Sequence, residues 1–139
     1  MRTTTRAVIA AGVTAVLAAA PLAAGGLVSE RGSQPTLGCL TTAQSTAEMN
    51  DCVGAAYAAA QTRLAAVYRK VLAGKGLASG DRSLLIHAQQ KWIQFRDADC
   101  SYAESLNKGG TLAAVDKGIC LVRDTVARAN ALQDDLTTS

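Results

Sequence analysis

The sequence predicts an all-α protein: a small three-helix antiparallel bundle with two disulfides, preceded by a signal peptide. Three segments carry apolar residues at steps of three and four, which is the spacing of one helix face. No segment alternates between apolar and polar residues over a useful length, so no sheet is expected. Four cysteines, an even number, follow an apolar leader and indicate a disulfide framework. The 139 residues suffice for one domain and are too few for two.

Residues 1–24 have the order of a secretory signal peptide. Arg2 and Arg6 give a positive start, residues 7–20 form an Ala-rich apolar centre, and Pro21 breaks the helix before a run of small residues. This order predicts cleavage near residue 24 and a periplasmic or secreted protein.

Two alternatives to cleavage concern the membrane. An uncleaved anchor is conceivable because residues 7–28 are long enough to span a bilayer, but Pro21 and the many Ala and Gly residues weaken it. A lipoprotein is disfavoured, because Leu37 stands one place too close to Cys39 for a lipobox. The membrane is therefore a partner only if the leader is retained.

Residues 25–38 are polar and rich in Gly, Ser and Pro, and they are expected to form a flexible linker before a helical domain over residues 39–136. The first helix is predicted to begin at a capping box, in which Ser45 accepts from a backbone N–H and Glu48 reaches back. Gly74 and Gly76 are expected to end it. Its predicted inner face consists of Met49, Cys52, Val53, Ala56, Ala60, Leu64, Val67 and Val71.

The second helix is predicted to start near Ser79 or Asp81, either of which can cap it, and to run to about Leu106. Its predicted inner face consists of Leu85, Ala88, Trp92 and Phe95. After a turn at residues 107–110, Thr111 is expected to cap a third helix. The apolar positions of that helix are Val115, Ile119, Val122, Val126, Ala129, Leu132 and Leu136.

The geometry of the hairpins favours two local disulfides. Cys100 lies nine residues before the Gly109–Gly110 turn and Cys120 ten after it, so an antiparallel hairpin places them at one height. Cys39 and Cys52 lie six and seven residues on either side of Ser45, so an incoming strand of chain folded back along the first helix joins them. Cys52 and Cys100 are nearly equidistant from the turn near Gly76, and this rival pairing stays open.

The small net charge argues against a nucleic-acid partner and against strong attraction to a membrane. Two of the 14 Lys and Arg residues and none of the 11 Asp and Glu residues lie in the leader, so the net charge falls from +3 to about +1 on cleavage. No nucleic-acid partner is expected.

The cysteines lack C-x-x-C spacing and the single His87 is distant from them, so neither a metal nor another cofactor is expected.

No pair of acidic residues has the environment that catalysis needs. Asp97 and Asp99 face different ways on a helix, and nothing nearby would raise one pKa and leave the other low. His87 lacks the strand-turn context of a catalytic triad. The sequence therefore predicts a protein that is not an enzyme.

Three sequence blocks carry a family resemblance. The first is Glu48-Met49-Asn50-Asp51-Cys52, followed by Leu64 and Tyr68. The second is Ala88-Gln89-Gln90-Lys91-Trp92-Ile93-Gln94-Phe95-Arg96-Asp97-Ala98-Asp99-Cys100. The third is Gly109-Gly110-Thr111, then Cys120-Leu121, Thr125, Arg128 and Leu132. In this order they resemble the LprI-type lysozyme-inhibitor family of small exported bacterial proteins. The resemblance covers essentially the whole domain and implies an α-helical, disulfide-bonded envelope protein, with a lysozyme as a candidate protein partner.

The motif residues Glu48, Asn50, Trp92, Arg96 and Asp97 are interpreted as structural. Trp92 and Arg96 share a helix face, so the guanidinium could stack on the indole or pair with Asp99 or Asp124. A recognition patch is the competing interpretation for these two residues. The predicted function is inhibition of a lysozyme by occluding its cleft, with the turns at 107–111 and 74–81 as equal candidates for the inserted segment. The alternative is a structural or interaction protein of the cell envelope with another partner.

Overall fold

The computed structural model describes residues 36–75 and 77–138. The predicted leader (1–24) and all but the last three residues of the predicted linker (25–38) lie outside the described residues. The cleavage prediction is therefore not addressed by the structure.

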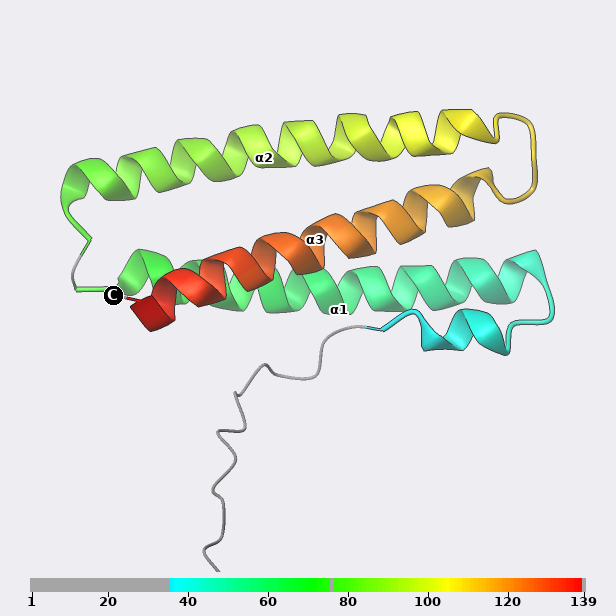
Figure 1. The fold of residues 1–139 in the computed structure, drawn as a ribbon, viewed down its shortest axis with the longest axis horizontal. Helices are drawn as coiled ribbons and strands as arrows, with labels where there is room; N and C mark the ends of the chain where they lie inside the picture. Colours follow the sequence, from blue (N-terminus) through cyan, green and yellow to red (C-terminus); the bar gives the residue numbers. More distant parts are fainter. Residues whose placement is uncertain (1–35, 76, 139) are drawn as a thin grey trace, which may run out of the picture. The chain divides into compact units, whose positions relative to one another are not determined.

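Three long α-helices form the domain: α1 (Thr46–Ala73), α2 (Ser79–Leu106) and α3 (Ala113–Thr138). A short 3-10 helix, η1 (Gly38–Thr41), precedes them and packs on α1. Successive long helices run in opposite directions, and α3 packs against both α1 and α2 (Figure 1). No strand occurs in residues 36–75 and 77–138, so the predicted all-α bundle with two disulfides is confirmed. None of the helices in this described part is long and apolar enough to cross a membrane.

The start of α1 follows the predicted capping box with a small shift. Ser45 Oγ accepts a hydrogen bond from the backbone N–H of Glu48 at 3.2 Å. The Glu48 carboxylate reaches back one residue further than expected and accepts from the backbone N–H of Gln44. Before it, the segment around Cys39 forms a short 3-10 helix that packs on α1, which agrees with the predicted fold-back along the first helix. At the α1 N-terminus, a side chain thus satisfies one of the orphan donors, the N–H of Glu48.

The starts of α2 and α3 differ from the predictions. Ala78 occupies the N-cap of α2, and no side chain caps this helix, so neither Ser79 nor Asp81 plays that role. Helix α3 begins at Ala113, and Thr111 therefore lies outside its cap position. The chain turns here through Gly109, whose φ of 85° is easily reached only without a Cβ atom.

The predicted inner faces of α1 and α3 are largely correct. A cluster of five buried residues joins the C-terminal halves of these helices: Leu64, Val67, Val71, Ala129 and Leu132. Leu85 and Trp92 of α2 are partly buried against it. Most of the other predicted positions on α1 and α3 are buried or half-buried.

The predicted inner face of α2 is only half correct. Ala88 and Phe95 are exposed, whereas Gln89, Arg96 and Cys100 are buried. The reason is that α2 carries apolar side chains on two stripes, and helical spacing does not say which stripe meets α3. Polar side chains occupy the interior here because they have partners: Gln89 accepts from Arg128 of α3, and Arg96 pairs with Asp97 and contacts Thr125 of α3.

Candidate functional site

Two disulfides fix the end of the bundle where α1 begins. Cys39–Cys52 ties η1 to α1, and Cys100–Cys120 ties α2 to α3. The Cα atoms are 5.9 and 5.4 Å apart respectively, within the usual range for a disulfide. Both preferred pairings are confirmed, and the rival pairing of Cys52 with Cys100 is wrong. The hairpin register decided it, since Cys100 and Cys120 stand at the same height on adjacent antiparallel helices.

Two carboxylates lie against the sulfur atoms of Cys100–Cys120. Asp99 Oδ2 is 3.7 Å from the Cys120 sulfur, and Asp124 Oδ2 is 3.8 and 3.9 Å from the two sulfurs. Arg123 contacts both acids, with Nε–Oδ1 at 2.9 Å to Asp124 and Nη2–Oδ2 at 3.5 Å to Asp99. The hydrogen bond and the charge of Asp124 raise the pKa of Arg123 above its ordinary value.

The two carboxylates and the two sulfurs, from Asp99, Asp124, Cys100 and Cys120, place four possible metal-ligand atoms within 4.8 Å of one another. The sulfurs are joined in a disulfide, however, and a metal-binding cysteine must be a thiolate. The oxidised cluster is therefore better understood as a shield of two carboxylates around one disulfide than as a metal centre. Arg123, whose Nη2 lies 3.6 Å from Cys120 Sγ, offsets part of the negative charge of this shield.

Arg96 is the centre of an aromatic and polar cluster between α1, α2 and α3. Its guanidinium carbon lies 5.0 Å from the Trp92 ring centroid and 5.6 Å from that of Tyr57 on α1. Arg96 Nη2 and Nε donate to Asp97 Oδ1 at 2.7 and 2.9 Å, and Nη1 donates to Thr125 Oγ1 of α3 at 3.5 Å. The predicted stacking on the indole is present, but the ion-pair partner is Asp97 and not Asp99 or Asp124.

A second arginine, from α3, extends this cluster at the indole ring. Arg128 of α3 lies 6.0 Å from the Trp92 ring centroid, and its Nε donates to Gln89 Oε1 at 3.0 Å. Gln89 belongs to the second block of the family resemblance, but it was not predicted to lie on the inner face of α2. The signal was available, because Gln89, Arg96 and Cys100 themselves follow helical spacing. Arg96 is only 8% exposed, so little of this cluster is offered to a partner.

The remaining motif residues do not gather at one place. Glu48 is exposed at the start of α1, and Asn50 is half-buried one turn in from that start. Asp97 is exposed on α2, where its carboxylate holds the Arg96 guanidinium. His87 is exposed. The motif residues thus occupy a helix start and an interhelical cluster rather than a cleft, and their structural role remains a prediction.

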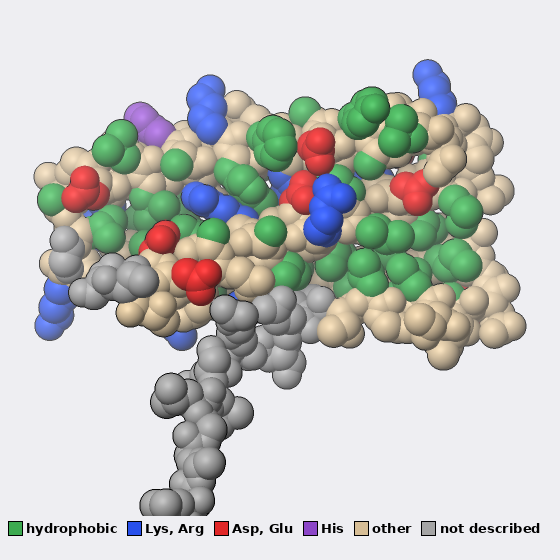
Figure 2. Space-filling view, in the orientation of Figure 1, with side chains coloured by type: hydrophobic (Ala, Val, Ile, Leu, Met, Phe, Trp, Pro, Cys, Tyr) green, Lys and Arg blue, Asp and Glu red, His purple; other side chains and the backbone are tan. Residues whose placement is uncertain are grey.

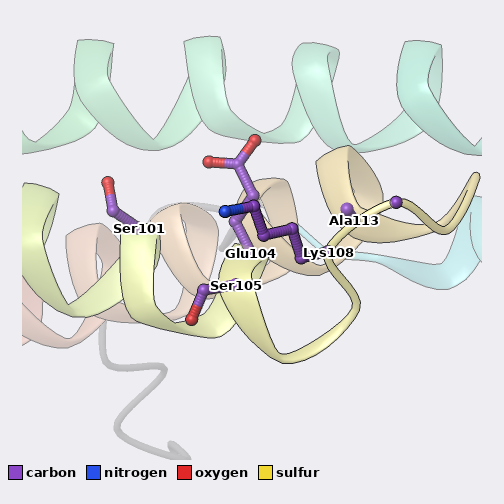
Figure 3. A pocket seen from close by; sticks show the side chains of 6 residues that line it. Ser101, Glu104, Ser105, Lys108 and Ala113 are labelled. Carbon is purple, nitrogen blue, oxygen red and sulfur yellow. The ribbon is translucent and has the colours of Figure 1, made fainter.

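The turn between α2 and α3 is braced from both sides. Lys117 Nζ and Glu104 Oε2 are 2.7 Å apart, and Asn107 donates through its side-chain amide to Asp116. A shallow pocket of about 350 Å³ opens here, lined by Ser101, Glu104, Ser105, Lys108, Gly109 and Ala113. Figure 3 shows the side chain of Lys108 extending from the turn across this pocket on the side of Glu104. The turn is thus an exposed but well-supported projection close to the Cys100–Cys120 disulfide.

Comparison with known proteins gives one match. A family model described as "Lysozyme inhibitor LprI" matches residues 39–132, which include both disulfides and most of the three helices. No curated protein and no solved structure matches the chain.

Proposed function

Because the chain belongs to the LprI lysozyme-inhibitor family, we propose that it is an exported, non-catalytic protein that inhibits a lysozyme by occluding its cleft. The match over residues 39–132 is the observation that carries this proposal. Two disulfides in one small domain support a location outside the cytoplasm, where oxidising conditions maintain them. A periplasmic or secreted protein also accords with the predicted leader.

Rigidity supports inhibition by shape. A segment that enters a cleft binds more tightly if it is held in its bound conformation beforehand, because less conformational entropy is lost on binding. The turn at residues 107–112 has this property. The Glu104–Lys117 ion pair, the Asn107–Asp116 hydrogen bond and the nearby disulfide brace its two ends.

We therefore favour the turn at 107–112 over the connection between α1 and α2 as the inserted segment. A lysozyme cleaves its substrate with a pair of carboxylic side chains in the cleft. Lys108 is exposed at the tip of the turn and supplies a cation that can pair with such a carboxylate. Binding to the cleft then depends more on the local charge of this turn than on the net charge of the cleaved chain, which is close to zero.

A titration of a cell-wall lysis assay with the oxidised, exported chain tests the proposal. We expect saturable inhibition of at least one lysozyme, and we expect Lys108→Glu to raise the inhibition constant by about 10-fold or more, because a close charge pair in an interface contributes about 1.5 kcal/mol or more. Lys75→Glu, in the other interhelical connection, is the matched control and should leave the constant unchanged.

Two results would count against parts of the proposal. If every lysozyme tested keeps its full activity at a large molar excess of this chain, the inhibitor function is removed. The alternative, an envelope protein with another partner, is then favoured. Inhibition that Lys108→Glu leaves intact while Lys75→Glu abolishes it would retain the function and move the inserted segment to the connection between α1 and α2.

A further inference from the structure

Helix α2 carries a second apolar stripe that the bundle does not use. Leu84, Phe95, Tyr102 and Leu106 are each between 63% and 68% exposed. Their spacings of 11, 7 and 4 residues place them along one line of the helix, and Ala88, Lys91 and Ala98 fill the gaps in alternating steps of four and three. Hydrophobic side chains are visible at the surface along α2 at the top of Figure 2.

This stripe points away from the contacts that α2 makes. Gln89, Arg96 and Cys100 face the interior, and they lie about a quarter to half a turn around the helix from the stripe. Alternating steps of four and three residues are the pattern of a coiled-coil seam, in which such side chains pack between those of a facing helix. No helix faces the stripe within residues 36–75 and 77–138.

We propose that a second copy of this chain covers the stripe, with the two α2 helices antiparallel about a two-fold axis near Phe95. In this register Leu84 lies level with Leu106 of the second copy, and Ala88 lies level with Tyr102. Large side chains thus meet either large apolar ones or a small one that leaves room for them. Phe95 meets its own counterpart on the axis. A self-complementary patch of this kind is what a two-fold interface requires.

The charges of Lys91 within the stripe and of Asp99 beside it favour the antiparallel arrangement. A parallel pairing would put Lys91 beside Lys91 and Asp99 beside Asp99, and like charges at one level repel. The antiparallel register instead brings Lys91 level with Asp99 of the second copy. Asp81 is likewise brought close to the turn that carries Lys108, so each lysine gains an acidic neighbour.

The size of the stripe indicates a small interface between the two copies. Four large side chains that are about two-thirds exposed offer on the order of 500 Å² per chain, so pairing would bury on the order of 1,000 Å², at the lower limit for a specific interface. Interfaces at this limit are commonly weak and transient, so we expect a concentration-dependent equilibrium between one copy and two, with a dissociation constant on the order of micromolar.

Sedimentation of the exported, oxidised chain from about 1 to 500 µM tests the proposal, because this range brackets a micromolar dissociation constant. We expect the average mass to rise from one copy to two. Phe95→Glu should weaken association by at least about 100-fold, since it buries two like charges at the axis. Ile93→Glu is the matched control, because Ile93 is also exposed on α2 but lies about half a turn around the helix. Circular dichroism should show that both variants are folded.

Cross-linking provides a second measurement that depends on the register. Phe95→Cys should form an intermolecular disulfide readily, because the two copies of residue 95 meet on the axis, whereas Ile93→Cys should not. Mass spectrometry would verify that both native disulfides are intact in each variant.

Three outcomes would overturn the proposal. One is a single-copy mass over the whole concentration range. Another is equal association of Phe95→Glu and Ile93→Glu. The third is a monomer whose inhibition of a lysozyme is lost in Phe95→Glu, which would assign the stripe to the lysozyme instead. Loss of association with unchanged inhibition by the monomer would support the dimer, and it would leave the proposed function intact.

Discussion

The two halves of the bundle are held together in different ways. In one half, which we call the disulfide half, the buried hydrophobic side chains are small: Cys52, Val53, Ala56, Cys100, Val115, Cys120 and Val122. In the other, the leucine half, the buried cluster of Leu64, Val67, Val71, Ala129 and Leu132 is joined by Trp92, Leu85 and Tyr68. Both disulfides lie in the half with the smaller side chains.

The difference follows from how much apolar area each half removes from water. Burial contributes roughly 25 cal/mol per Å², so Ala, Val and Cys contribute less than Leu and Trp. A close approach compensates in part, because Gly118 on α3 packs directly on Val53 of α1. Covalent cross-links supply the remainder in the disulfide half by restricting the unfolded chain. Because disulfides persist in the oxidising conditions outside the cytoplasm, the exported setting of the family allows this way of stabilising the disulfide half.

The largest expected effect comes from removing both disulfides. Replacing all four cysteines by Ala should lower the free energy of unfolding by roughly 4–8 kcal/mol, at about 2–4 kcal/mol for each cross-link. This is comparable with the whole stability of a small domain. Thermal melting followed by circular dichroism measures it, and hydrogen exchange should show protection lost first in the disulfide half. An unchanged melting temperature would contradict the comparison between the halves.

A cavity in the leucine half should cost less. Leu132 is among the most buried side chains, so Leu132→Ala is expected to lower the free energy of unfolding by about 2–5 kcal/mol. Urea denaturation measures this loss. Leu112→Ala is the control and should change stability by less than about 0.5 kcal/mol, because Leu112 is exposed. Equal effects of the two substitutions would mean that the leucine cluster is not the main core.

A substitution at the close contact between α1 and α3 should lower the free energy of unfolding by a smaller amount, and its control should raise it. A Cβ atom at Gly118 would lie 2.5 Å from Val53 Cγ2, so Gly118→Ala should destabilise by about 1–3 kcal/mol. Gly54→Ala meets nothing within 4 Å and should stabilise α1 by roughly 0.5–1 kcal/mol.

A double variant tests whether the Gly118 effect arises from the contact itself. Combining Gly118→Ala with Val53→Ala removes the clashing methyl groups, so the two changes should cost less together than their sum. Additive losses in urea denaturation would locate the effect elsewhere.

The smallest expected effect concerns the shield around Cys100–Cys120. Asp99 and Asp124 should slow the approach of an anionic thiolate, because two charges about 4 Å apart repel by about 1 kcal/mol even in water. Asp124→Asn should therefore speed reduction by glutathione about 5-fold. Cysteamine, whose ammonium offsets its thiolate charge, should show a smaller increase. Asp81→Asn is the control, because Asp81 is exposed at the opposite end of α2 from Cys100, and an equal acceleration there would remove the electrostatic explanation.

Sequence alone determined the helical class and the inner faces of α1 and α3, and it favoured the two disulfide pairings that the structure then confirmed over a rival pairing. Each depends on local information. Leu64, Val67 and Val71 repeat with helical spacing on a helix with one clear apolar side. Cys100 and Cys120 lie at equal distances from a turn that Gly109 marks, so chain geometry brought them together without knowledge of the rest of the fold.

Only the tertiary structure decided which side of α2 faces inward. Leu85, Trp92 and Phe95 formed a plausible face in the sequence, yet Phe95 is exposed and Arg96 is buried. Arg96 is stable there because Tyr57 from α1 and Thr125 from α3 join Trp92 and Asp97 around its guanidinium. A buried charge depends on partners far away along the chain, and helix periodicity carries no information about them.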